Sequence, residues 1–149
     1  MSRQNVELVR AAWEAWERGD TASIFEFYDP DIVWDQTHAE TPELSTVYHG
    51  HDGVRQFLRA WLAPFDSYYA RPEEFIDAGE AVVVRLRQGG RGKQSGVEVE
   101  MPPYWQVYRL RDGRAVRIEV YDDRGEALKA VGLTGKRCRR KTWKPPRES

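Results

Sequence analysis

The spacing of apolar residues changes near position 65, and this change restricts the fold more than any other feature. Before it, apolar residues recur every three or four positions. This predicts a helix over 3–18, a short one from Asp20 or Thr21 to about Tyr28, and a third over about 51–62. After it, runs rich in Val and Tyr alternate with turn residues, which predicts strands. Helices gathered before strands indicate an α+β domain, with the helices against one face of an antiparallel sheet.

The strands are expected at 31–36, 67–76, 81–87, 96–110 and 115–121, and a short helix over 124–131 follows them. Pro72 interrupts the second of these strands, and the pair Pro102-Pro103 is a natural site for a bend or bulge in the fourth. A strongly curved sheet around three helices would enclose a conical cavity. The connection 37–50 is longer than most loops, and loops of this length often act as lids.

Charge divides the chain at about residue 135. The predicted single domain, 1–135, carries a net charge of −7, whereas the tail 136–149 holds seven basic residues and one acidic residue. We expect a solvated, flexible tail; contact with nucleic acid is the less favoured alternative. The sequence shows neither a signal-peptide pattern nor an apolar run near the roughly 18 residues of a membrane span. Its single cysteine, Cys138, favours the cytoplasm.

Five stretches, taken together in this order, resemble the SnoaL-like group of the nuclear transport factor 2-like superfamily. They are NVELVRAAWEAWERGD, FYDPDIVWD, YHGHDGVRQFL, EEFIDAGEAVVVRLRQGGRGKQSG and VYRLRDGRAVRIEVYDDRGEALKAVGL. The resemblance covers roughly 3–133. It implies a cone-like α+β barrel, in which a curved antiparallel sheet wraps around three N-terminal helices and leaves one deep pocket. It also implies a homodimer through the outer face of the sheet.

The superfamily includes isomerases, cyclases, epoxide hydrolases, dehydratases and binding proteins, so activity must be argued from the site. The resemblance to ketosteroid isomerases puts Asp35 where those enzymes carry a proton-shuttling carboxylate, and an apolar pocket would raise its pKa. His38 could orient Asp35, act as an acid or contact the ligand. Gln106 stands where they hold an oxyanion donor, but Ala12 replaces their tyrosine, which argues against steroid isomerisation. An exposed Asp35 and a solvated His38 are the alternatives.

Aromatic residues are the expected ligand-binding walls of the pocket, although the same residues could serve only as core. They are Trp13, Trp16, Tyr28, Trp61, Tyr104 and Tyr108. Strand alternation places Tyr104, Gln106 and Tyr108 on one side of the sheet. The other side of the sheet is expected to line the pocket mouth or, preferably, to form the dimer face. It carries Trp105, Arg109, Arg117, Glu119 and Tyr121.

The resulting hypothesis is a pocket protein that binds or converts a hydrophobic, cyclic or polyketide-like molecule by cofactor-free acid–base chemistry. No metal is expected, because His49, His51 and Asp52 do not form a full ligand set. The glycine-rich segment 89–92 is no phosphate site, since it joins two strands and does not precede a helix. The alternative is a non-catalytic ligand-binding or protein-interaction module with the same fold.

Overall fold

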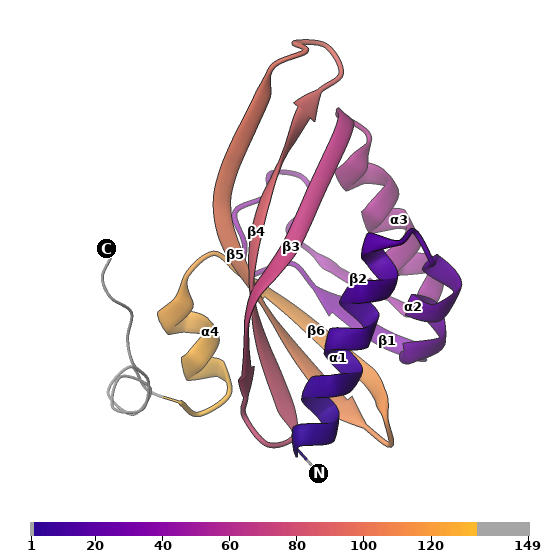
Figure 1. Ribbon diagram of the computed structural model, residues 1–149, viewed down its shortest axis with the longest axis vertical. Coiled ribbons are helices and arrows are strands. Elements are labelled where there is room, and N and C mark those ends of the chain that lie inside the picture. The colour runs from indigo at the N-terminus through magenta and orange to yellow at the C-terminus, as the bar shows by residue number, and fades with distance from the viewer. Residues whose placement is uncertain (1, 134–149) are drawn as a thin grey trace.

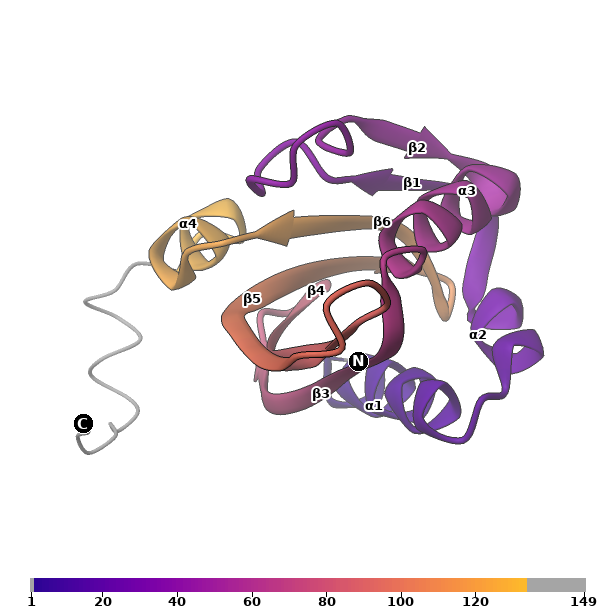
Figure 2. The same cartoon turned by 90° about the horizontal axis from the view of Figure 1, so that it is seen from above.

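Three helices lie on the concave side of a curled sheet, and a fourth lies on its convex side (Figure 1, Figure 2). The computed structural model describes residues 2–133. In this range the helices are α1 (Ser2–Glu17), α2 (Thr21–Phe27), α3 (Gly50–Leu62) and α4 (Arg124–Ala130). The strands are β1 (Tyr28–Asp35), β2 (Val47–His49), β3 (Phe65–Asp77), β4 (Ala81–Gly92), β5 (Glu98–Arg111) and β6 (Arg114–Tyr121). The α+β class and the curved sheet around the N-terminal helices are confirmed.

The strand order is β2-β1-β6-β5-β4-β3, and the sheet does not close into a complete barrel. β1 runs parallel to β6, with Trp34 opposite Ile118 and Asp35 opposite Glu119. The other neighbouring pairs are antiparallel, so the sheet is mixed where an antiparallel one was expected. A parallel pair needs a long crossover, which α3 and strands β2–β5 supply.

β1 and β3 begin earlier than expected, and the prolines of β1, β3 and β5 lie where the ladder is irregular. β1 begins at Tyr28, expected in the second helix, and contains Pro30; its register with β6 shifts between Tyr28 and Val33. Likewise, the register of β3 with β4 shifts beside Pro72. At Pro102-Pro103 three steps along β5 match two along β4, which is the expected bulge. A proline at such a position removes no ladder hydrogen bond.

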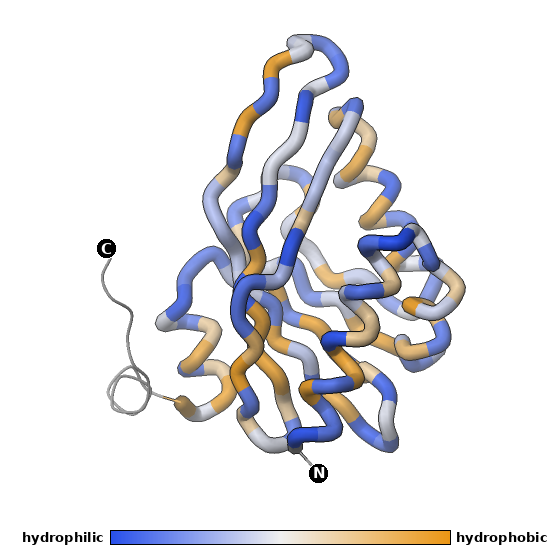
Figure 3. Tube along the Cα trace, in the orientation of Figure 1, coloured by the Kyte–Doolittle hydropathy of each residue, from blue (hydrophilic) through white to orange (hydrophobic). Residues whose placement is uncertain are grey.

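The main core lies between the concave face and the three helices. Val82, Val84 and Leu86 of β4 point into it and are fully buried, as are Val9 of α1 and Val54 of α3. Figure 3 shows hydrophobic residues gathered in the lower half of the sheet, whereas the upper ends of β3, β4 and β5 are mostly hydrophilic or neutral and the helices carry both kinds of residue. A space between this apolar lining and the helices forms the candidate site.

A smaller core lies on the convex face, beneath α4. Val83, Trp105, Val107 and Tyr121 pack there against Ala127 of the helix. The expectation that Trp105, Glu119 and Tyr121 form a dimer face is therefore wrong, because all three are buried within the single chain. The alternation of side chains along the strands correctly predicted that these residues share one face of the sheet. Part of that face is covered by α4, the last helix of the same chain.

Within residues 2–133 no helix is both long enough and apolar enough to cross a membrane. The expected basic tail, 136–149, lies outside the described residues.

Candidate functional site

A cavity of about 100 Å³ lies between the concave face of the sheet and helices α1, α2 and α3. Its walls are mainly aromatic, and they include every aromatic residue proposed from the sequence. These residues are Trp13, Trp16, Tyr28, Trp61, Tyr104 and Tyr108, joined by Phe25, Trp34, Phe57 and Tyr68. Thr21 is an exposed lining residue and Ala12 a half-buried one, so the cavity reaches the surface beside the connection from α1 to α2.

The tyrosines of the cavity are phenols that stay protonated. Burial raises the pKa of Tyr28, Tyr68, Tyr104 and Tyr108. The Tyr68 hydroxyl donates to Oε1 of Gln88 (2.7 Å), and the Tyr108 hydroxyl donates to Oε1 of Gln106 (2.6 Å). These hydroxyl groups can donate or accept a hydrogen bond. Because they keep their protons near neutral pH, they are not present as phenolates and cannot serve as bases.

Three buried glutamines supply most of the remaining polarity. Oε1 of Gln36 accepts from Nε1 of Trp34 at 2.8 Å. Gln88 is engaged at both ends, since its Nε2 also donates to the Pro102 carbonyl at 2.9 Å. Gln106 differs, because its Nε2 has no hydrogen-bond acceptor within residues 2–133. Because Gln106 lines the cavity, this amide N–H can donate to a ligand oxygen there. Within residues 2–133 the buried side-chain donors without a partner are Nε1 of Trp13, which also lines the cavity, and Nε1 of Trp105.

Among residues 2–133, the cavity lining contains a single charged group, the carboxylate of Asp122 directly after β6. Asp122 is exposed, and its Oδ2 accepts a hydrogen bond from the Glu40 backbone N–H at 2.7 Å. No lysine, arginine or histidine of this part of the chain lines the cavity. An apolar space without a cation disfavours anionic ligands, because nothing compensates for the desolvation of their charge.

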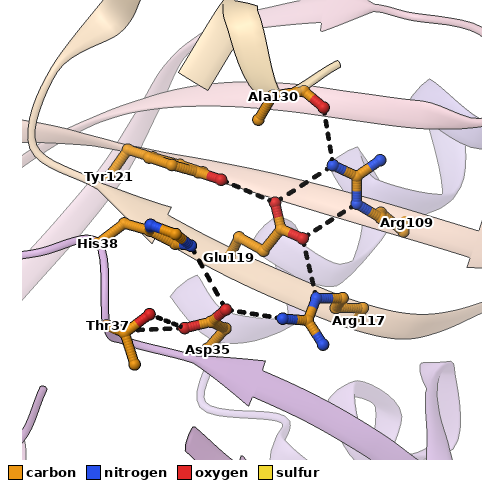
Figure 4. A network of polar contacts seen from close by, with 8 residues as sticks. All are labelled: Asp35, Thr37, His38, Arg109, Arg117, Glu119, Tyr121 and Ala130. Atoms are coloured by element: carbon orange, nitrogen blue, oxygen red, sulfur yellow. Dashed lines mark hydrogen bonds and ion pairs between the residues drawn. The ribbon is translucent and has the colours of Figure 1, made fainter. Parts of the chain in front are cut away.

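Asp35 and His38 do not line this cavity. Asp35 is buried, but its side chain points to the convex face (Figure 4), so the expectation that it lines the pocket is wrong. Successive strand residues point to opposite faces, and Trp34 and Gln36 occupy the cavity side. His38 follows Asp35 to the convex face, where its ring stacks on Tyr121 with centroids 4.6 Å apart. Gln106 is therefore separated from the two residues expected to work with it.

On the convex face Asp35 belongs to a network of ion pairs (Figure 4). Its Oδ2 lies 2.7 Å from Nη2 of Arg117 and 3.4 Å from Nε2 of His38. Its Oδ1 accepts from the backbone N–H of Thr37 (2.9 Å) and from the Thr37 hydroxyl (2.5 Å). Nε of Arg117 continues the network to Oε2 of Glu119 at 2.8 Å.

The network ends at α4. Glu119 accepts two hydrogen bonds from Arg109, at 3.1 and 3.2 Å, and one from Tyr121 at 3.0 Å. Arg109 also donates to the carbonyl of Ala130 at 3.0 Å. The network thus joins β1, β5, β6 and the end of α4.

Burial alone would raise the pKa of Asp35, but hydrogen bonds from Thr37 and the neighbouring His38 and Arg117 outweigh it, and the pKa falls below its ordinary value. The pKa of Glu119 is also lowered. Burial raises it, but the hydrogen bonds from Arg109, Arg117 and Tyr121 have the larger, opposite effect. The raised pKa expected for Asp35 is therefore wrong. A paired carboxylate with a lowered pKa is a poor proton acceptor near neutrality.

Several polar residues of the cavity were not among the candidates from the sequence, and they include Gln36, Gln88 and Asp122. Strand alternation contained the signal. Ile32 and Trp34 are apolar and point inward, so Gln36 does too, and Val120 likewise puts Asp122 on the cavity side.

The histidines near β2 give no sign of a metal site. His51 lies with Nε2 2.9 Å from the carbonyl oxygen of Tyr28. Residues 2–133 contain no group of three His, Cys, Asp or Glu side chains that could hold a metal ion.

The family model described as the SnoaL-like domain matches residues 9–118. No curated protein matches the chain. An NTF2-like protein of unknown function from Burkholderia pseudomallei K96243 is 29% identical, with a TM-score of 0.69 over 87% of this chain and 98% of that one.

Two further structures share the fold at lower identity. TerC, co-crystallised with polyporic acid, is 24% identical, with a TM-score of 0.69 over 86% of this chain and 98% of its own. An NTF2-like protein from Burkholderia thailandensis E264 is 22% identical, with a TM-score of 0.70 over 83% of this chain and 96% of that one.

Proposed function

The chain belongs to the SnoaL-like family, and from this premise we propose that its cavity binds a small, neutral, hydrophobic cyclic molecule of the polyketide-like kind. The observation that carries the proposal is the uncommitted amide donor of Gln106 inside aromatic walls that, among residues 2–133, include no cation. Aromatic walls favour a flat ring system, and the amide favours a ligand with a carbonyl or hydroxyl oxygen. TerC, with the same fold, was crystallised with polyporic acid.

The size of the cavity limits the ligand. A dry protein cavity of about 150 Å³ holds benzene, and this cavity measures about 100 Å³. A ligand with more than one ring therefore requires side chains to move. Trp16 and Trp61 are only half-buried lining residues, and their displacement would widen the space.

The proposal is tested with two probes of similar shape, naphthalene and 1,4-naphthoquinone, by quenching of tryptophan fluorescence. The wild-type protein is expected to bind both, and the quinone about tenfold more tightly because one hydrogen bond to a buried donor is gained. Gln106→Leu should remove this preference and leave naphthalene binding almost unchanged. Absence of binding for both probes would reject the ligand site, and an unchanged preference in the variant would reject the role of Gln106.

A second candidate function, acid–base conversion of the bound molecule, is favoured by Asp122. It is the one carboxylate in the lining, and it lies at an end of the cavity that solvent reaches. A carboxylate beside an apolar ligand can move a proton without a cofactor. Asp122→Asn should then abolish turnover of a molecule that co-purifies with the protein while binding persists. Equal turnover in the variant would leave binding as the function.

We also propose a cytoplasmic homodimer. The single cysteine favours the compartment. The part of the convex face not covered by α4 favours the dimer, because it carries both basic and acidic side chains. These are Arg85, Arg87, Glu73 and Glu100, and the arginines of one copy could pair with the glutamates of a second copy. Sedimentation equilibrium tests it: Arg87→Glu should shift a dimer towards monomer, and a monomeric wild type would exclude the dimer.

A further inference from the structure

We propose that residues 37–46 form a gate over a second entrance to the cavity and that Asp122 is its latch. The inference rests on the proposed ligand site, and it concerns how a ligand reaches that site.

The cavity approaches the surface at two separate places. One lies beside the connection from α1 to α2, where Thr21 is exposed and Ala12 is half-buried. The other lies where Ala39 and Thr41 of the segment 37–46 meet Asp122, which is also exposed. Figure 2 shows that the loop joining β1 to β2 and the connection from α1 to α2 lie at opposite ends of the molecule. The segment 37–46 therefore covers a different end of the cavity from the one beside the α1–α2 connection.

The segment is a compact unit with its own hydrogen bonds. Its base is closed by the Gln36 N–H, which donates to the Thr46 carbonyl at 3.0 Å. Inside it, the Ser45 hydroxyl donates to the Ala39 carbonyl at 2.7 Å and lies 2.9 Å from the Thr41 hydroxyl. A loop whose ends meet and whose middle is bonded to itself can move as one body about its ends.

Few contacts hold this unit against the end of β6. One is the hydrogen bond from the Glu40 N–H to Oδ2 of Asp122, and another is the stacking of His38 on Tyr121. Within residues 2–133 no other hydrogen bond joins the segment to the chain that follows β6. Elsewhere the segment is held more firmly, since Ala39 is buried in the main core, Leu44 packs against that core, and the Tyr48 hydroxyl donates to the Leu44 carbonyl at 2.9 Å. The Asp122 bond concerns the end of the segment that faces β6, and its loss should raise the open population there.

The test compares two substitutions that each remove one exposed carboxylate. Asp122→Ala removes the latch acceptor, whereas Glu40→Ala, the control, keeps the backbone N–H that the latch uses. Hydrogen exchange of the Glu40 amide and the association rate of 1,4-naphthoquinone are measured for both. Asp122→Ala should raise both rates about tenfold, the effect of losing one hydrogen bond to a charged acceptor. Glu40→Ala should leave both near the wild-type values.

Glu40→Pro separates the latch from any proton transfer by Asp122, since it removes the donor and leaves the carboxylate. It should match Asp122→Ala in both measurements. Unchanged amide exchange in segment 37–46 of Asp122→Ala would overturn the latch. Faster exchange with an unchanged association rate would overturn the gate. If the probe does not bind to the wild type, the proposed function fails, and the exchange of the segment alone decides the latch.

Discussion

Replacement of Arg117 by Met tests whether the network on the convex face stabilises the fold. Arg117 lies between two buried carboxylates, 2.7 Å from Asp35 and 2.8 Å from Glu119. Breaking a fully buried ion pair costs about 3–5 kcal/mol. Two features lower this value here. The Arg117 side chain is 37% exposed, so solvent screens its charge. Each carboxylate also keeps other donors, Thr37 for Asp35 and Arg109 for Glu119.

We therefore expect Arg117→Met to lower the free energy of unfolding by about 2 kcal/mol at pH 7, which corresponds to about 4–8 °C in Tm. Urea denaturation followed by tryptophan fluorescence measures it. Arg114→Met, at the exposed start of β6, is the control and should change stability by less than about 0.5 kcal/mol.

The pH dependence gives a second check on the same variant. The folded-state pKa values of Asp35 and Glu119 are lowered, so their stabilisation is complete above the unfolded pKa, about 4, and is lost as the pH falls through the folded values. The loss caused by Arg117→Met should therefore be largest at neutral pH and shrink below about pH 4. A loss under about 0.5 kcal/mol at pH 7, or one that grows on acidification, would refute the reasoning.

Three further substitutions test local features by the same urea denaturation. Gly90→Ala should destabilise by about 1–3 kcal/mol, because a Cβ there would meet the Ser67 carbonyl oxygen at 2.4 Å; no loss would mean that β3 shifts freely. Glu43→Gly should stabilise by about 0.5–1 kcal/mol, since Glu43 has a φ of 71°, which glycine adopts without strain; a loss of stability would contradict this. Asp123→Ala should cost about 1 kcal/mol, because Asp123 accepts from the Glu126 N–H at 2.9 Å and caps α4; no change would show that packing alone holds this helix.

The helices and the meander β3–β6 could be predicted because their signals are local. The apolar spacing of α1 and α3 marks one face of each helix, and Asp112-Gly113, both with positive φ, form the expected turn between β5 and β6. The parallel pairing of β1 with β6 has no such signal, since it joins residues far apart in the sequence. The extension of β4 through Gly89 and Gly90 was also unpredictable. The side chain of Tyr69 and the backbone of Ser67 approach these glycines from β3, and only the folded sheet reveals that contact.

The aromatic walls of the candidate site could be predicted, and the face of Asp35 was predicted wrongly for an identifiable reason. A motif resemblance placed Asp35 in the pocket, but the alternation of its own strand places it outside, because Ile32 and Trp34 are the inward residues. A shift of one residue moves every side chain of a strand to the opposite face. Where motif and alternation disagree, the alternation is the safer guide, since it follows from backbone geometry.

The parallel pair explains why the ion network and the cavity gate lie back to back. Asp35 and Tyr121 end β1 and β6 on the convex face, and the next residues, Gln36 and Asp122, turn to the cavity. Arg117 fixes β1 against β6 through Asp35 and thereby sets the distance between Asp122 and the segment that begins at Thr37. A short latch of 2.7 Å tolerates little change in that distance. None of the network's side chains touches the cavity, so we expect any effect of Arg117 on the latch to act through the position of β1 against β6.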